Sequence, residues 1–293
     1  MNQPLFLLLS GVICTLLFAL RARKMPQVLP LCGLSLVLGA VLGTVLSKLV
    51  YYVSQLNFMI ANGWLASLVA TDPAQWCFFG GAAGVVLGVV LAARFTKVPV
   101  VKALDAFAPV GALLVTLARE AAFWQQDAMI AWGEYLENEA LWFFPLAVHN
   151  EWGEYYLAVF MLEAMFALLV AVLALCCFKK HTFLRTVFYL CLGQIFLESL
   201  HSDSLSWLFV RVEQLLSMLV VVAVLVRYGL QLGKTPLWKM LAICVVCTGL
   251  FVGVEFALDK TPWPIPVIYG AMLLGLAALA VTEITAEKKL QKA

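Results

Sequence analysis

Nine apolar runs divide the chain, and each is long enough to cross roughly 30 Å of hydrocarbon. Backbone N–H and C=O groups inside a bilayer must hydrogen-bond to one another, so runs of this kind form α-helices. They cover residues 4–20, 28–53, 77–93, 103–124, 155–178, 183–200, 205–226, 237–258 and 265–282. The sequence therefore predicts an all-α polytopic membrane protein with about nine transmembrane helices.

Composition excludes an ordinary soluble domain. Of the 293 residues, 12% are charged and 64% are hydrophobic, whereas soluble domains average roughly a quarter charged residues. No basic stripe with interleaved aromatic residues is present, so we expect no nucleic-acid partner.

Lysine and arginine predict the orientation. If the N-terminus is outside, 15 of the 19 Lys and Arg residues lie at the inner ends of helices, as the positive-inside rule requires. These residues are Arg21, Arg23, Lys24, Arg94, Lys97, Lys102, Lys179, Lys180, Arg185, Arg227, Lys234, Lys239, Lys288, Lys289 and Lys292. We therefore predict an outer N-terminus and a cytoplasmic C-terminus.

Two segments between spans have a distinct composition. Residues 125–154 contain six acidic residues, three tryptophans and no Lys or Arg. An interfacial cap that lies on the headgroups and a solvated acidic loop explain this segment equally well. Residues 54–76 are nearly uncharged, and we expect them to lie in the interface as a short helix.

Several ionisable residues fall inside or at the ends of the predicted spans, where they are costly and usually line a polar cavity or pair with one another. They are Lys48, Arg119, Glu120, Glu163, Glu198, Arg211, Glu213 and Glu255. The predicted topology places all of them toward the outer half of the membrane, which suggests a shared cavity open to the outer leaflet. The alternative is that individual residues reach the interface or pair for structural reasons.

Such a cavity suits the phosphate of a phospholipid. Arginine binds phosphate oxygens through two parallel hydrogen bonds, and carboxylates serve as general bases or as partners that orient the arginines. The residues alone therefore indicate a lipid-headgroup or ion site and do not specify a reaction.

The eight cysteines all lie within apolar runs. Cys244 and Cys247 form a C-x-x-C pattern, which occurs in metal and redox sites. Because no histidine or further cysteine is near, we interpret the pair as buried thiols that pack as small hydrophobic groups. We expect no metal and no cofactor.

Six short segments, in order along the chain, carry a family resemblance. They are L-G-A-V-L-G-T-V-L-S-K-L-V-Y-Y (38–52), F-F-G-G-A-A-G (78–84), D-A-F-A-P-V (105–110) followed by Arg119, Y-L-A-V-F-M-L-E-A (156–164), L-G-Q-I-F-L-E-S-L (192–200) and E-Q-L-L-S (213–217). Together they resemble the bacterial prolipoprotein diacylglyceryl transferases. The last segment resembles the family's G-Q-x-x-S.

That family moves a diacylglyceryl group from phosphatidylglycerol to a lipobox cysteine thiol at the outer face of the membrane. The resemblance therefore implies two partners, phosphatidylglycerol (or another anionic phospholipid) and a lipobox-containing prolipoprotein. It also implies a bacterial cytoplasmic (inner) membrane. Residues 1–235 would form the family's seven-helix domain with its cap at about 125–154, and residues 236–293 an additional hairpin with a basic tail.

Several functional positions of the family differ here. Its histidine falls on Phe79 and an essential arginine on Gln194, while its asparagines and glutamate fall on Ala122, Gln125 and Asp127. The resemblance assigns lipid or phosphate binding to Arg119, Gln194 and Gln214. We expect Arg211 to make the phosphate contact that the family arginine makes at the position of Gln194.

The resemblance leaves proton transfer to Glu163, Glu198 and His201. His201 follows Glu198 by three residues, so the two could share a helix face as a base and its orienting carboxylate. We favour the alternative that His201 is an exposed loop histidine.

Two other functions stay open. A non-catalytic phospholipid or lipoprotein binding protein would keep the scaffold without the chemistry, as the changes at Phe79 and Gln194 suggest. A small transporter would also line its path with charged groups, but the chain has no internal repeat and no matching pair of broken helices.

Overall fold

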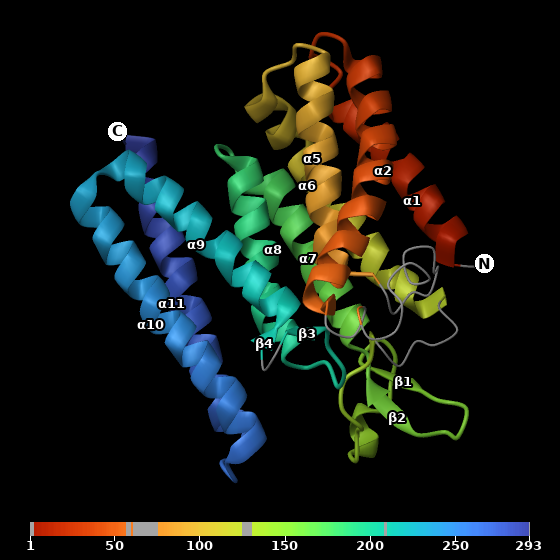
Figure 1. Ribbon diagram of the computed structural model, residues 1–293, viewed down its shortest axis with the longest axis vertical. Coiled ribbons are helices and arrows are strands. Elements are labelled where there is room, and N and C mark those ends of the chain that lie inside the picture. Colours follow the sequence, from red (N-terminus) through yellow and green to blue (C-terminus); the bar gives the residue numbers. More distant parts are fainter. Residues whose placement is uncertain (1–2, 57–59, 61–75, 125–130, 208–209, 293) are drawn as a thin grey trace. The chain divides into compact units, whose positions relative to one another are not determined.

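The computed structural model describes residues 3–56, 60, 76–124, 131–207 and 210–292. The chain forms two compact units (Figure 1). Unit 1 comprises Met1–Leu190 and Leu200–Glu213, and unit 2 comprises Cys191–Ser199 and Gln214–Ala293.

Within the described residues, seven helices are long and apolar enough to cross a membrane, which confirms a multi-pass membrane protein. These are α2 (Val28–Ser54), α5 (Phe78–Phe95), α6 (Val100–Glu120), α7 (Val159–Cys176), α9 (Val212–Leu232), α10 (Lys234–Lys260) and α11 (Ile265–Lys292). The helices α1 (Gln3–Arg21) and α8 (Thr182–Glu198) occupy the other two predicted positions. That α1 and α8 also span the membrane, giving nine spans in total, stays a prediction.

Glycines bring α2 and α5 close together in unit 1, where the two helices lie side by side (Figure 1). A Cβ atom on Gly88 would lie 2.7 Å from the Cα atom of Gly39, and one on Gly80 would lie 2.9 Å from the Cα atom of Ser47. In lipid, helices gain affinity mainly from close van der Waals packing, which small residues permit. The glycine spacing therefore sets the distance between these two backbones.

Small and aromatic side chains pack α6 against its neighbours. The buried positions of α6 include Ala106 and Ala112, and those of α7 include Ala164 and Ala167. On the α1 side, the ring of Phe18 meets the ring of Phe107 edge-on, with centroids 5.4 Å apart. Helix α6 is thus held in place along most of its length.

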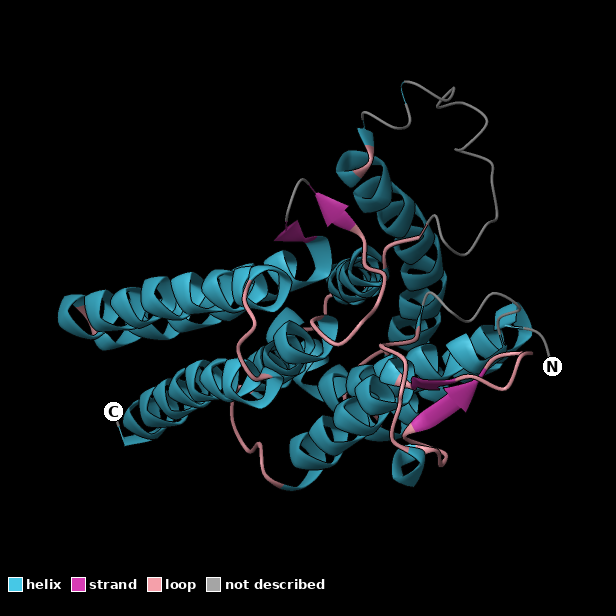
Figure 2. Ribbon diagram, turned by 90° about the horizontal axis from the view of Figure 1, so that it is seen from below, coloured by secondary structure: helices cyan, strands magenta, loops and turns pink. Residues whose placement is uncertain are grey.

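Beyond one end of these helices, part of the predicted acidic segment folds into a small cap together with the residues that flank it. It contains the 3-10 helices η2 (Ala121–Trp124) and η4 (Glu139–Leu141) and the antiparallel strands β1 (Ala147–His149) and β2 (Tyr155–Leu157), which Figure 2 shows in magenta. The all-α expectation missed these strands, because three-residue strands are too short to give an alternating pattern.

Aromatic contacts stabilise the cap. The ring of Trp142 stacks on Tyr155 with centroids 4.5 Å apart, and its indole N–H donates to the carbonyl of Leu136 at 2.8 Å. Tyr156 donates to the Glu154 carboxylate at 3.0 Å, and this hydrogen bond raises the pKa of the phenol. The cap also exposes Phe144 and Trp152, as expected for an interfacial surface.

Two sequence predictions fall largely outside the described residues. They are the interfacial helix expected at 54–76 and the start of the cap at 125–130, with the motif positions Gln125 and Asp127.

Unit 2 contains a pair of long helices, α10 and α11, that follow α9. A single residue, Gly233, separates α9 from α10 at φ 108°, a backbone conformation that favours glycine. A Cβ atom on Gly275 would lie 2.8 Å from the ring of Phe251, so this glycine lets α11 pack closely on α10.

Replacing Gly88 by Ala should destabilise unit 1, because the added methyl group meets backbone atoms of α2 that cannot move independently. Overpacking of this kind costs about 1–3 kcal/mol. We expect the unfolding temperature of the purified protein, followed by tryptophan fluorescence, to fall by several degrees. Gly33→Ala in α2 is the matched control, because nothing lies within 4 Å of its added Cβ atom. Equal unfolding temperatures for the two variants would contradict the packing argument.

Candidate active site

Arg119 lies at the centre of a buried ionic cluster in unit 1. It occupies the last turn of α6, where the helix dipole favours a cation. Its Nη2 atom donates to Oε2 of Glu213 at 3.0 Å, and its Nε atom lies 3.3 Å from Oε2 of Glu163. The second contact is an ion pair without hydrogen-bond geometry. One guanidinium group thus serves two carboxylates.

Glu163 connects this ion pair to a histidine. It lies in α7 with 2% of its side chain exposed, and its Oε1 atom is 3.3 Å from Nε2 of His201. His201 is 8% exposed, so the interpretation of this residue as an exposed loop histidine is wrong. The carboxylate of Glu163 contacts Arg119 through one oxygen and His201 through the other.

The cap holds His201 in place. Gly133 forms an isolated β-bridge with His201, and the Ser202 hydroxyl donates to the carbonyl of Trp132 at 3.1 Å. A Cβ atom on Gly133 would lie 2.5 Å from the carbonyl oxygen of Leu200, so only glycine allows this approach. His201 is therefore buried beside the cap, although Ser202 and Asp203, which follow it, are exposed.

Glu213 joins the cluster from the first turn of α9, where the helix dipole favours an anion. Its Oε1 atom accepts a hydrogen bond from the backbone N–H of Phe79 at 3.4 Å and lies 3.8 Å from the Cys77 thiol. Above the guanidinium group, the ring of Phe78 lies 3.7 Å from the Arg119 Cζ atom, a cation–π contact. The start of α5 therefore forms one wall of the cluster.

Ser47 fixes the start of α5 against α2. Its hydroxyl donates to the carbonyl of Cys77 at 2.7 Å, and its own carbonyl accepts the Cys77 N–H at 3.3 Å. These two hydrogen bonds position the backbone that presents Phe79 to Glu213.

Arg211 supports the backbone next to the cluster. Its Nη1 atom donates to the carbonyl of His201 at 3.0 Å and to the Ser204 hydroxyl at 2.7 Å. It lies in the short hairpin of β3 (Ser206–Trp207) and β4 (Val210–Arg211). Its predicted phosphate contact stays a prediction.

The other predicted site residues pair within unit 2. Gln194 donates to Glu198 at 3.1 Å along α8. Gln214 donates to the carbonyl of Ile195 at 3.2 Å and to Glu255 of α10 at 2.9 Å. A carboxylate from the C-terminal hairpin therefore orients the Gln214 amide.

Sequence reasoning noted Glu213 as an intramembrane charge but assigned it no function. It also missed Ser47, Cys77 and Phe78. The signal that could have found Glu213 was its position near the outer end of a predicted span, at the same predicted depth as Arg119.

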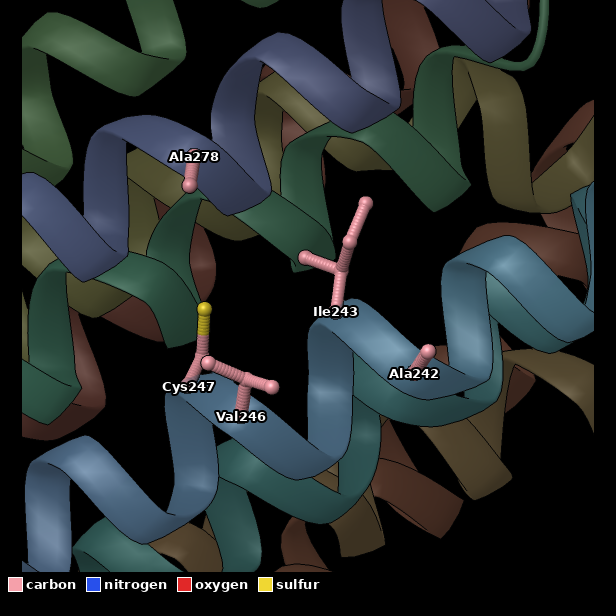
Figure 3. Close-up of a pocket in the computed structure, with 5 residues that line it drawn as sticks. All are labelled: Ala242, Ile243, Val246, Cys247 and Ala278. Carbon is pink, nitrogen blue, oxygen red and sulfur yellow. The ribbon is translucent and has the colours of Figure 1, made fainter.

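The C-x-x-C pair plays no part in this cluster. Both thiols are free and buried, and Cys247 donates to the carbonyl of Gly275 at 3.6 Å, as expected for packed thiols. Cys247 lines an apolar pocket between α10 and α11 that has a volume of about 290 Å³. Figure 3 shows the side chains that line this pocket. Its lining residues are Ala242, Ile243, Val246, Cys247 and Ala278. A hydrocarbon chain suits such a lining better than a polar ligand.

The fold and the cluster define a class, namely multi-pass helical membrane proteins with a buried arginine–carboxylate site at helix ends. Comparison with known families is more specific. The family model described as prolipoprotein diacylglyceryl transferase matches residues 5–229. The chain belongs to this family, and α10 and α11 lie entirely beyond the matched segment.

Individual relatives agree with this assignment. The chain is 27% identical over 224 residues to the phosphatidylglycerol–prolipoprotein diacylglyceryl transferase of Listeria innocua. This alignment covers 73% of this chain and 79% of the relative. The chain is 28% identical over 151 residues to the enzyme of that name from Clostridium novyi, covering 49% of this chain and 58% of the relative. No solved structure matches the chain.

Removing the shared cation should destabilise unit 1. In Arg119→Met, two buried carboxylates are left without their counter-charge, which costs about 3–5 kcal/mol. Adding Glu163→Gln and Glu213→Gln to this variant removes the uncompensated charges, so we expect most of the stability to be recovered. Reversible unfolding in detergent–SDS mixtures measures both effects. If the triple variant were less stable than Arg119→Met alone, uncompensated carboxylate charge would not be the cause of the stability lost in Arg119→Met.

Proposed function

We propose that the chain transfers a diacylglyceryl group from phosphatidylglycerol to the cysteine thiol of a lipobox-containing prolipoprotein. The main support for this function is the ionic cluster around Arg119, which occurs in a chain of the prolipoprotein diacylglyceryl transferase family. The names of the relatives support phosphatidylglycerol as the donor lipid and a prolipoprotein as the acceptor.

The reaction would form one bond and break another. The acceptor sulfur attacks the glyceryl carbon that carries the phosphate, the carbon–oxygen bond breaks, and glycerol phosphate leaves with the bonding electron pair. The thiol, with an ordinary pKa of about 8.5, first loses its proton to a base. Arg119 is suited to hold the phosphate oxygens, because its guanidinium group donates in a planar fork.

We assign proton transfer to the pair of Glu163 and His201, whose atoms lie 3.3 Å apart. A histidine oriented by a buried carboxylate is a common general base. Glu198, in the same role, stays a proposal from the family resemblance. So do Gln194 and Gln214 as lipid-headgroup contacts, and Arg211 as a second phosphate contact.

A second candidate is a non-catalytic phospholipid or lipoprotein binding protein on the same scaffold. The observation that favours it is Phe79, whose side chain stands at the position of the family histidine and cannot accept a proton. Gln194 in place of an arginine points the same way.

We also propose that all nine helices span a bacterial inner membrane, with the N-terminus outside and the C-terminus in the cytoplasm. The distribution of Lys and Arg supports this orientation. In this arrangement the cap and the Arg119 cluster lie at the outer face. Residues 1–235 would form the family domain and residues 236–293 an added hairpin, and the family match over 5–229 supports this division.

A transfer assay tests the proposed reaction. Purified protein is mixed with phosphatidylglycerol labelled in its glyceride and with a lipobox peptide, and label on the peptide cysteine is measured. We expect Arg119→Ala to reduce transfer by at least about a hundredfold, a decrease typical of removing one stabilising donor. Arg185→Ala is the matched control, because Arg185 also lies over a ring, that of Phe178.

Three outcomes separate the candidates. Transfer that disappears only with Arg119→Ala supports the enzyme. Saturable phosphatidylglycerol binding with no transfer moves the assignment to the binding protein. Transfer that survives Arg119→Ala removes Arg119 from the mechanism.

Cysteine labelling tests the orientation. Cys176 and Cys177 are exposed at the predicted inner end of α7, while the other six cysteines are buried. A membrane-impermeant maleimide should therefore label the native chain only after spheroplasts are lysed. With both exposed cysteines changed to Ser, Trp152→Cys in the cap should be labelled in intact spheroplasts. The reverse pattern would invert the proposed topology.

A further inference from the structure

The carboxylate of Glu213 is bound in unit 1 as a ligand anion would be. Each of its oxygens has a separate donor: Oε2 accepts from Arg119 at 3.0 Å, and Oε1 accepts from the backbone N–H of Phe79 at 3.4 Å. The Cys77 thiol adds a weaker contact to Oε1 at 3.8 Å. Residue Glu213 is 8% exposed, so these protein donors take the place of water.

These donors are the ones that a phosphate group selects. A guanidinium fork and a backbone N–H in the first turn of a long helix both bind phosphate oxygens well. Helix α5 has 18 residues, and its N-terminal dipole adds a partial positive charge at this point. The position therefore suits an anion, and a side chain of the protein occupies it.

The charge balance around Arg119 argues against a phosphate bound alongside both carboxylates. The guanidinium group of Arg119 is already shared by two carboxylates, Glu163 and Glu213. A phosphodiester brought into contact with Arg119 would add a further negative charge beside two buried ones, and like charges at such distances repel strongly in a shielded site. One of the carboxylates has to withdraw or lose its charge.

We infer that the Glu213 carboxylate occupies the anion position of this site, and that the phosphodiester of an anionic lipid binds there by displacing it. Glu163 keeps its contact with His201 and is the less suitable one to move. Glu213 thus lowers the affinity of the site for every anion that has to displace it. The inference rests on the proposed function for the identity of the ligand as a phospholipid.

Removing the charge of Glu213 should strengthen lipid binding. The full chain, in nanodiscs of phosphatidylcholine, is titrated with dihexanoyl phosphatidylglycerol and the dissociation constant is measured by calorimetry. We expect Glu213→Gln to bind about tenfold more tightly than the native chain, a modest effect for removing one competing charge. Glu213→Gln combined with Arg119→Ala should abolish the gain, because the guanidinium group is the shared donor.

Glu120→Gln is the matched control, because it removes one negative charge from the residue next to Arg119. Its affinity should stay within about twofold of the native value, which separates local competition from a general change in charge. An unchanged or weaker affinity in Glu213→Gln would overturn the inference and make Glu213 a positioning residue for Arg119.

Two further arms keep the test decisive. If Glu213→Gln fails to fold, Glu213→Asp replaces it. Its side chain is one methylene shorter and cannot reach both donors, so a smaller gain in affinity is expected, and none would overturn the inference. Inorganic phosphate is titrated in parallel, and a gain with inorganic phosphate alone would reject a lipid as the ligand.

The transfer assay distinguishes this inference from the proposed function. Tighter lipid binding in Glu213→Gln without transfer in any variant would retain the inference and reject the enzyme. Normal transfer by the native chain, together with weaker lipid binding in Glu213→Gln, would retain the enzyme and reject the inference.

Discussion

The ion pairs of Arg119 tie together segments that are far apart in the chain. Its guanidinium group contacts Glu163 of α7, Glu213 at the start of α9 and the ring of Phe78 at the start of α5. A buried carboxylate without a counter-charge is costly, so Glu163 and Glu213 depend on the arginine for their charge balance. One cation thus links the two helix ends that carry these carboxylates.

The neighbouring structure is built to hold these charges at fixed distances. Glycines let α2 and α5 approach until backbone atoms touch, and Ser47 then bonds the Cys77 backbone at the start of α5. On the other side, the cap buries His201 against Gly133. Both walls use glycine for the same reason: a side chain would keep the two backbones apart.

Two departures from the family pattern fall in this cluster. Phe79 lacks the side chain of the family histidine, yet its backbone N–H contributes a donor to the cluster. Glu213 stands where the family has glycine and adds a second carboxylate to Arg119. In unit 2, the hairpin beyond the family match supplies Glu255 to Gln214.

The amino-acid pattern was sufficient for the helices and for the membrane class, because long apolar runs leave the backbone no other way to satisfy its hydrogen bonds. It was also sufficient for the family, through the order of six short motifs. It identified Arg119, Glu163 and Glu213 as intramembrane charges, since any ionisable residue there is conspicuous. The tertiary structure decided which of them pair, that His201 is buried, and that the Phe79 backbone takes part. Those contacts join residues separated by tens of positions, and helical periodicity carries no information about partners on other helices.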